Sequence, residues 1–163
     1  MAKIFDENNK EDILREIMRQ VLFSLHFMHE QNWLHSDVKA ENIMLTGNGY
    51  EARLIDFGCS CEVGSRDCCM TRVIMPPEFL LKAGYLPTSD MWSVGLMVTQ
   101  LITGERQFMS EEKSALMDAW HDMLGPLPQH VLDSGKKTGQ FFHPNGTLIV
   151  TPEIEERRSM DIP

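Results

Sequence analysis

The chain has 163 residues, enough for one domain with a sizeable core, and 42% hydrophobic and 24% charged residues are ordinary for a globular protein. Its net charge of −9 disfavours nucleic-acid binding through a broad basic surface and leaves a basic peptide partner open. No apolar run approaches the roughly 18 residues of a membrane span, and the N-terminus lacks an apolar signal region. We therefore expect an intracellular protein of the cytoplasm or nucleus, with no direct nucleic-acid partner and no membrane association.

A long amphipathic helix is predicted from Glu11 to Gln31. Its apolar side chains recur every three or four positions, the spacing that gathers them on one helix face. They are Ile13, Leu14, Ile17, Met18, Val21, Leu22, Leu25 and Met28. A helix that only packs against a core explains this pattern, so no site is assigned to it.

Polar groups gather directly after this helix, in the stretch H-S-D-V-K-A-E-N at positions 35–42. It sets a carboxylate (Asp37), an ammonium group (Lys39) and a carboxamide (Asn42) within six residues. A second carboxylate, Asp56, follows an apolar run and precedes Phe-Gly. Hard oxygen ligands of this kind suit Mg²⁺ bound to phosphate, and the set fits phosphoryl transfer.

Two short strands, 43–45 and 52–55, are predicted to pair as a hairpin. The turn between them, 46–49, contains the Asn-Gly pair typical of tight hairpin turns. The pairing would carry Asn42 and Asp56 on the two ends of the hairpin. We therefore expect both residues to lie near Asp37.

All four cysteines fall within eleven residues of a polar segment between positions 58 and 76. They are Cys59, Cys61, Cys68 and Cys69. The segment has no clear periodicity and is expected to be a flexible loop. The spacing does not match paired C-x-x-C zinc ligands, and nothing requires an oxidising compartment, so reduced, unligated thiols are expected.

Two further helices are predicted. The first, 91–102, has Asp90 among its capping residues, ends at Gly104 and is almost wholly apolar, so we expect it to be buried on all sides. The second begins at 110–112 with an acidic first turn and runs to Gly125. Beyond it we expect an irregular, turn-rich tail whose last dozen residues are a solvated end rather than a site.

The order and spacing of four motifs resemble the second half of a eukaryotic protein kinase domain. They are H-x-D-x-K-x-x-N at 35–42, D-F-G at 56–58, P-P-E in place of A-P-E at 76–78, and D-x-W-S-x-G at 90–95. The resemblance covers residues from about 6 to 146. It implies a mainly α fold, a protein-kinase-like large lobe with a short β-hairpin carrying the catalytic and D-F-G motifs, and residues 1–163 as one partial kinase domain.

Among kinases the chain resembles the CMGC group. L-G-x-x-P at 124–128, G-K-K-x-x-x-F-F-x-x-x-G at 135–146 and the small residue Ser36 are similar to SR-protein kinases, LAMMER kinases and dual-specificity tyrosine-regulated kinases. This likeness implies a protein substrate that is basic or Ser/Arg-rich.

The resemblance also assigns roles to single residues. Asp37 would accept or orient the proton of the substrate hydroxyl, and Lys39 would steady the transferring phosphate. ATP would be bound through Lys39, Asn42 and Asp56, with Mg²⁺ held by Asn42 and Asp56. Structural roles would fall to His35, Gly58, Glu78 and Asp90, of which Asp90 would anchor the backbone of the catalytic loop. Taken singly, each of these residues could be an ordinary turn, cap or solvated group.

Two parts of a kinase domain are not recognisable. Nothing before Glu11 resembles the glycine-rich phosphate loop, the strand lysine or its glutamate partner, so we expect the small β lobe to be absent. The arginine that would pair with Glu78 is not reached either. Glu78 must therefore find another cation, expose itself or leave the neighbouring segment loose, because an unpaired buried carboxylate is costly.

The main interpretation is a fragment of a serine/threonine or dual-specificity kinase, which transfers the ATP γ-phosphate to protein hydroxyls but has little or no activity alone. The alternative is a catalytically weak pseudokinase-like interaction module, favoured by the unusual Val-Ile-Met at 73–75; a third is an incomplete stretch of a longer protein. No tyrosine lies between positions 56 and 78, which leaves Ser60, Ser65 and Thr71 as candidate regulatory hydroxyls.

Overall fold

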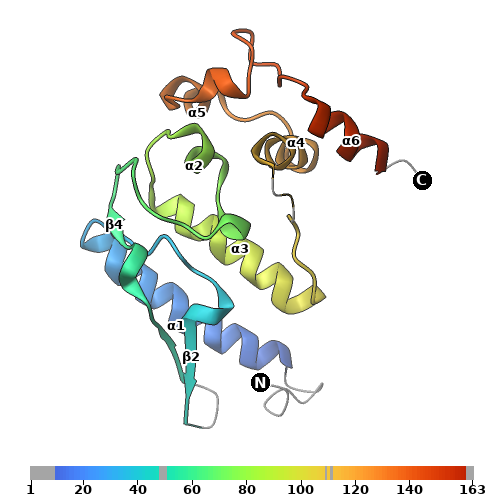
Figure 1. Cartoon of the computed structure of the whole chain (residues 1–163). Helices are drawn as coiled ribbons and strands as arrows, with labels where there is room; N and C mark the ends of the chain where they lie inside the picture. The colour runs from blue at the N-terminus through green and yellow to red at the C-terminus, as the bar shows by residue number, and fades with distance from the viewer. Residues whose placement is uncertain (1–9, 48–50, 109, 111, 161–163) are drawn as a thin grey trace.

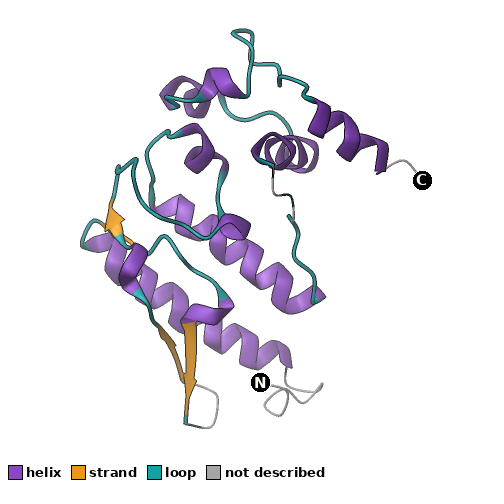
Figure 2. Cartoon of the chain, in the orientation of Figure 1, coloured by secondary structure: helices purple, strands orange, loops and turns teal. Residues whose placement is uncertain are grey.

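The computed structural model describes residues 10–47, 51–108, 110 and 112–160 (Figure 1). Over these residues the fold is mainly helical, with two small two-stranded sheets, as expected (Figure 2). The helices are α1 (Lys10–Glu30), α2 (Pro77–Leu81), α3 (Pro87–Thr103), α4 (Lys113–Leu124), α5 (Gln129–Ser134) and α6 (Pro152–Met160). The strands are β1 (Trp33–Leu34), β2 (Ile43–Thr46), β3 (Glu51–Leu54) and β4 (Cys61–Glu62), and 3₁₀ turns form η1 (Ala40–Asn42), η2 (Phe57–Cys59), η3 (Arg72–Ile74) and η4 (Thr138–Gln140).

The predicted long helix is confirmed as α1, which packs against the β2–β3 hairpin. Its buried face carries Ile13, Ile17, Val21 and Leu25, because residues three and four apart lie on the same side of a helix. The hairpin pairs in the antiparallel register Ile43↔Leu54 and Thr46↔Glu51, which confirms the two predicted strands. Of its predicted turn, Asn48 and Gly49 lie outside the described residues.

Helix α3 runs beside α1 and contributes to both hydrophobic clusters of the molecule (Figure 1). Val94 and Met97 join the cluster of α1 and the hairpin, whereas Trp92 and Leu96 pack into the second cluster. The helix ends where predicted, at Gly104 with φ 79°, a conformation that glycine adopts without strain. Burial on all sides was wrong: Met91 and Ile102 are 43% and 61% exposed, so part of this apolar helix faces solvent.

The second cluster joins α2, α4, α5 and the chain that follows them. Its centre is aromatic: Trp120 meets Trp92 and Phe108 edge-on, with ring centroids 5.6 and 6.1 Å apart. Phe141 and Phe142 of the F-F run are both buried in this cluster. The region after residue 125 is therefore part of a core, although much of it has no regular secondary structure.

Two expectations about the second half of the chain were wrong. Helix α4 begins at Lys113, so Glu112 is its N-cap and its first turn is not acidic. The end of the chain is not a solvated tail but includes α6, whose Ile154 is completely buried. Arg157 and Arg158 of α6 donate to the buried carboxylate of Asp118 in α4, each through a 2.8 Å hydrogen bond. These ion pairs and the burial of Ile154 dock α6 on α4.

Within the described ranges, none of the helices combines the length and the apolar character needed to cross a membrane.

Candidate active site

The stretch 35–42 forms a buried loop between β1 and β2, and its backbone is bound to α3. Ser36 has φ 65°, in the left-handed region. The carboxylate of Asp90, completely buried, accepts from His35 N at 2.9 Å and from Ser36 N at 2.8 Å. Its Oδ2 also lies 2.8 Å from His29 Nε2 of α1. Asp90 thus supplies the acceptors that the turn itself cannot provide.

The carboxylate of Asp37 accepts hydrogen bonds from three other residues of the site. Its Oδ2 accepts from Lys39 Nζ at 2.7 Å and from Asn42 Nδ2 at 3.0 Å, while Oδ1 accepts a longer bond, at 3.3 Å, from Thr71 N. Burial alone would raise the pKa of Asp37, but the hydrogen bonds from Lys39, Thr71 and Asn42 outweigh it and hold the pKa below its ordinary value. The carboxylate is therefore ionised at neutral pH, and among the contacts of the described residues Oδ1 has fewer donors than Oδ2.

Asp56 follows the hairpin into the same area. Ile55 N donates to the carbonyl of Asn42 at 2.9 Å, so the ends of the two strands remain together beyond the hairpin pairing. Asp56 itself is exposed and has φ 62°, and its Oδ1 accepts from Gly58 N at 3.2 Å. A Cβ on Gly58 would lie 3.2 Å from that same oxygen, so the glycine leaves room for the turn.

His35 joins the catalytic-loop stretch to the D-F-G stretch. Its Nε2 lies 3.1 Å from the carbonyl of Ile55, its Nδ1 accepts from Asp37 N at 3.3 Å, and its ring meets Phe57 edge-on at 5.3 Å. Burial lowers the pKa of His35, against the smaller opposing effects of the Ile55 carbonyl and nearby carboxylates. The neutral imidazole, with its proton on Nε2, satisfies both hydrogen bonds.

The segment from Phe57 to Pro76 contradicts the expectation of reduced thiols. Cys59 is bonded to Cys69 and Cys61 to Cys68, and none of the cysteines is free. The sequence could not show this because the pairing needs the two halves of the segment to fold back side by side, which brings the Cα atoms to 5.2 and 5.9 Å. The segment is also tied at its start, where β4 pairs with β1. It is therefore a cross-linked structure rather than an unconstrained loop.

The far end of this segment reaches Asp37 through Thr71. Besides the backbone bond already described, the Thr71 hydroxyl accepts from Lys39 Nζ at 2.8 Å. The sequence named Thr71 only as a candidate regulatory hydroxyl, and no local pattern links it to Asp37, since 34 residues separate the two. The hydroxyl of Ser60, another candidate, is a buried atom without a hydrogen-bond partner.

Glu78 in α2 meets a hydroxyl. Ser89, at the start of α3, donates to Glu78 Oε1 at 2.7 Å, and Glu78 is half-buried. A hydroxyl partner and partial exposure together reduce the cost of the carboxylate, so of the three expected outcomes partial exposure is found, together with a hydroxyl donor in place of a cation. This contact links α2, which directly follows the cross-linked segment, to the same helix that carries Asp90.

Comparison with known proteins identifies the family of the chain. Residues 3–138 match the family described as "Protein kinase domain", and the chain belongs to that family. Among its relatives it is 31% identical to rat dual specificity tyrosine-phosphorylation-regulated kinase 3 over 137 residues, which are 82% of this chain and 23% of the rat protein. It is 31% identical to the probable serine/threonine-protein kinase dyrk2 of Dictyostelium discoideum over 141 residues, 83% of this chain and 15% of that one. With the serine/threonine-protein kinase AFC1 of Arabidopsis thaliana it shares 30% identity over 172 aligned positions, 87% of this chain and 36% of that one.

These relatives place the chain with the CMGC protein kinases, in the neighbourhood of the dual-specificity tyrosine-regulated type, as the motifs predicted. The chain spans between 15% and 36% of the length of these three relatives.

Proposed function

We propose that this chain forms the large lobe of a protein serine/threonine kinase, or of a dual-specificity one, that transfers the γ-phosphate of ATP to a protein hydroxyl. One observation carries the proposal: Lys39, Asn42 and Thr71 all converge on the carboxylate of Asp37. These contacts bring an ammonium group, a carboxamide and a backbone N–H to one ionised carboxylate, an arrangement suited to a group that orients a substrate hydroxyl.

Asp37 is the proposed base. The substrate hydroxyl donates to Oδ1, the less occupied oxygen, and Asp37 orients the hydroxyl and accepts its proton as the bond to phosphorus forms. Lys39 and Asn42 keep Oδ2 occupied, so the carboxylate cannot rotate freely. The ammonium group of Lys39, two residues from Asp37, steadies the negative charge of the transferring phosphate.

The donor chemistry of the site fits Mg²⁺ and ATP. Asn42 uses its Nδ2 on Asp37, so its carboxamide oxygen is the atom it offers a metal, and the exposed carboxylate of Asp56 offers a second hard ligand. No group of three or more His, Cys, Asp or Glu side chains among the described residues is arranged to hold a metal alone. Mg²⁺ would therefore be held jointly by these residues and the nucleotide phosphates, whose charge it neutralises.

The same proposal assigns residues 1–163 to one partial kinase domain. The sequence contains no G-x-G-x-x-G motif, and the small β lobe that would cover the nucleotide is not recognisable in it. We therefore expect purified 1–163 to show little or no turnover. Phosphorylation of a protein at an ordinary kinase rate by this chain would contradict that expectation.

Calorimetric titration of purified 1–163 with ATP, with and without Mg²⁺, tests the proposed function. We expect Mg²⁺-dependent binding that is lost in Asp56→Asn and retained in the matched control Asp67→Asn, whose exposed carboxylate pairs with Lys82. No ATP binding by a chain shown to be folded would favour the alternative, an interaction module that does not transfer phosphate.

The preference for a basic or Ser/Arg-rich substrate stays a prediction. It rests on the net charge of −9 and on the resemblance to SR-protein kinases. Electrostatic complementarity over a whole surface steers the encounter of enzyme and substrate, whereas the groups beside the reacting hydroxyl decide which substrate fits.

A further inference from the structure

Residues 68–70 of the cross-linked segment are tied to the rest of the molecule by covalent bonds. Cys69 is bonded to Cys59 and Cys68 to Cys61. Among the residues that the structure describes, no hydrogen bond or ion pair joins residues 68–70 to another group. The position of these three residues therefore depends on the two disulfides.

Thr71 follows directly and transmits that position to the site. Its N–H donates to Asp37 Oδ1 at 3.3 Å, and its hydroxyl accepts from Lys39 Nζ at 2.8 Å. The bond to Asp37 is already long, so a small displacement of Thr71 removes it. The disulfides thus control a contact with the proposed base and with the proposed phosphate-binding lysine.

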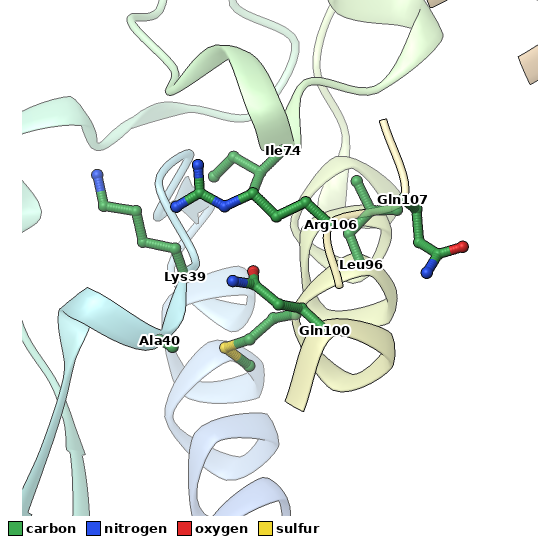
Figure 3. Close-up of a pocket in the computed structure, with 8 residues that line it drawn as sticks. Lys39, Ala40, Ile74, Leu96, Gln100, Arg106 and Gln107 are labelled. Carbon is green, nitrogen blue, oxygen red and sulfur yellow. The ribbon is translucent and has the colours of Figure 1, made fainter. Parts of the chain in front are cut away.

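Ile74, three residues further on, is anchored independently of the cysteines. It is 5% exposed, and its carbonyl accepts from Ser93 Oγ of α3 at 3.1 Å. Together with Leu96 of α3, it lines a small hollow beside Lys39 (Figure 3). If the disulfides break, Ile74 therefore stays on α3, and the chain before it is free to move about the turn η3.

The two disulfides differ in their access to a reductant. Cys69 is exposed, whereas the other three cysteines are half-buried. The sulfur of Cys61 lies 3.2 Å from the hydroxyl of Ser36, which is 1% exposed in the catalytic loop. A thiol reductant therefore reaches the bond between Cys59 and Cys69 first, since its thiolate must contact a sulfur atom.

We propose that the two disulfides form a reversible redox switch that sets the contact of Thr71 with Asp37 and Lys39. In the oxidised chain Thr71 is held against both side chains. In the reduced chain the segment moves away about η3, and Lys39 keeps only its bond to Asp37. The inference rests on the proposed function for its consequence, because these are the residues proposed to bind the substrate hydroxyl and the phosphate.

A dithiol is the reductant, and each disulfide takes two electrons and two protons from it. One thiolate of the dithiol attacks a cysteine sulfur and forms a mixed disulfide, which the second thiol of the reductant then breaks. The protein gains two thiols, and the reductant becomes a disulfide. A low-molecular-weight disulfide reverses the reaction by the same exchange.

Amide hydrogen exchange of purified 1–163, before and after treatment with dithiothreitol, tests the proposal. We expect the Thr71 amide to exchange at least roughly tenfold faster after reduction, the effect of losing one hydrogen bond. The amides of His35 and Ser36 should exchange at unchanged rates, because their acceptor is Asp90. Reoxidation with glutathione disulfide should restore the slow exchange at Thr71.

Labelling with an amine-reactive reagent gives a second measurement, at Lys39. Reduction removes one of the two acceptors of its ammonium group, so its labelling, measured by mass spectrometry, should rise roughly two- to tenfold. Lys113, exposed at the start of α4, is the matched control and should be labelled equally in both states.

Paired cysteine variants separate the two bonds. We expect Cys59→Ser with Cys69→Ser to reproduce most of the faster Thr71 exchange, because this bond lies nearest to Thr71 in the chain. Cys61→Ser with Cys68→Ser should have a smaller effect. The variant with all four substitutions is the control for the reagent: its Thr71 exchange should be fast and should not respond to dithiothreitol, while circular dichroism checks its fold.

Four outcomes would overturn the proposal. The first is an unchanged Thr71 amide after reduction, and the second is an equal acceleration at His35 and Ser36, which would mean that the bonds only stabilise the whole fold. The third is slow exchange that glutathione disulfide does not restore. The fourth is a set of four thiols that react with an alkylating reagent before reduction.

The proposed function can fail separately, because exchange and labelling need neither ATP nor turnover. A redox-dependent Thr71 amide in a chain that does not bind ATP would keep the switch and reject the kinase activity. Binding of ATP with Mg²⁺ by a chain whose Thr71 amide ignores reduction would do the reverse.

Discussion

The two stretches that meet at Asp37 are held in place by different means. The catalytic-loop stretch 35–42 is largely buried, and its backbone is bound to Asp90 of α3. The cross-linked segment 57–76 is mostly half-exposed or exposed and is held by two disulfides and by the contacts of Thr71. The position of Asp37 thus depends on the folded core, whereas the groups that approach it from outside depend on covalent bonds that a reductant can break.

The largest expected effect is on the buried side of this comparison. Asp90→Ala leaves the N–H groups of His35 and Ser36 buried without their acceptor, so we expect a loss of about 3–5 kcal/mol in the free energy of unfolding. Denaturant unfolding followed by circular dichroism measures it. The control Asp67→Asn removes an exposed ion pair with Lys82 and should cost no more than about 1 kcal/mol. Equal losses in the two variants would show that Asp90 does not hold the loop.

Reduction tests the exposed side. The disulfides close loops of sequence separation 10 and 7, and because one lies inside the other, we expect their loss to cost about 2–4 kcal/mol together. Unfolding and limited proteolysis with and without dithiothreitol measure this, and new cleavage should fall between residues 59 and 71. Mass spectrometry after alkylation provides the control: four thiols that react before reduction would contradict the disulfides.

Thr71 marks the contact between the two stretches. In Thr71→Val the ammonium group of Lys39 loses one acceptor and keeps Asp37, so we expect a loss of about 1–2 kcal/mol in stability. The matched control is Thr46→Val, which removes a hydroxyl that donates to the exposed carboxylate of Glu51. It should change stability by less than about 0.5 kcal/mol. If Thr71→Val were as mild as its control, the segment would not be fixed through this hydroxyl.

The smallest expected effect concerns pH and lies outside the site, at Asp118. Burial would raise the pKa of Asp118, but Arg158 and Arg157 outweigh it and lower the pKa below the ordinary 3.8. A lowered folded-state pKa gives stability that is present above the ordinary value and is lost as the pH falls through the folded one, at about 1.4 kcal/mol per pKa unit. Acid unfolding between pH 5 and pH 2 should therefore be less steep in Asp118→Asn. An identical pH profile would show that this carboxylate is not paired.

Local patterns predicted the regular elements well. The three-four spacing of α1 and the paired strands of the hairpin depend only on neighbouring residues, and both were found within a residue or two of their predicted bounds. Helix α6 was missed because Ile154 is its single fully buried apolar side chain and its other support, Asp118, lies about 40 residues earlier. A helix stabilised by distant ion pairs leaves little periodic signal.

The candidate site shows the same limit. The residues of the motif H-x-D-x-K-x-x-N could be named from the sequence, since they lie within one short loop, and their chemistry follows from their side chains. Thr71 could not be assigned to the site, because it is brought to Asp37 and Lys39 by a segment far away in the chain. The cysteines were misjudged for a related reason, since their spacing alone does not reveal which of them approach each other.

The sequence by itself determined the protein kinase family, the mainly helical fold and the short polar loop around Asp37, because motif spacing and helix periodicity are properties of neighbouring residues. The tertiary structure alone decided the disulfide pairing, the docking of α6, the buried support of Asp90 and the approach of Thr71 to Asp37. Each of these depends on side chains separated in the chain, and their distances exist only once the helices have packed.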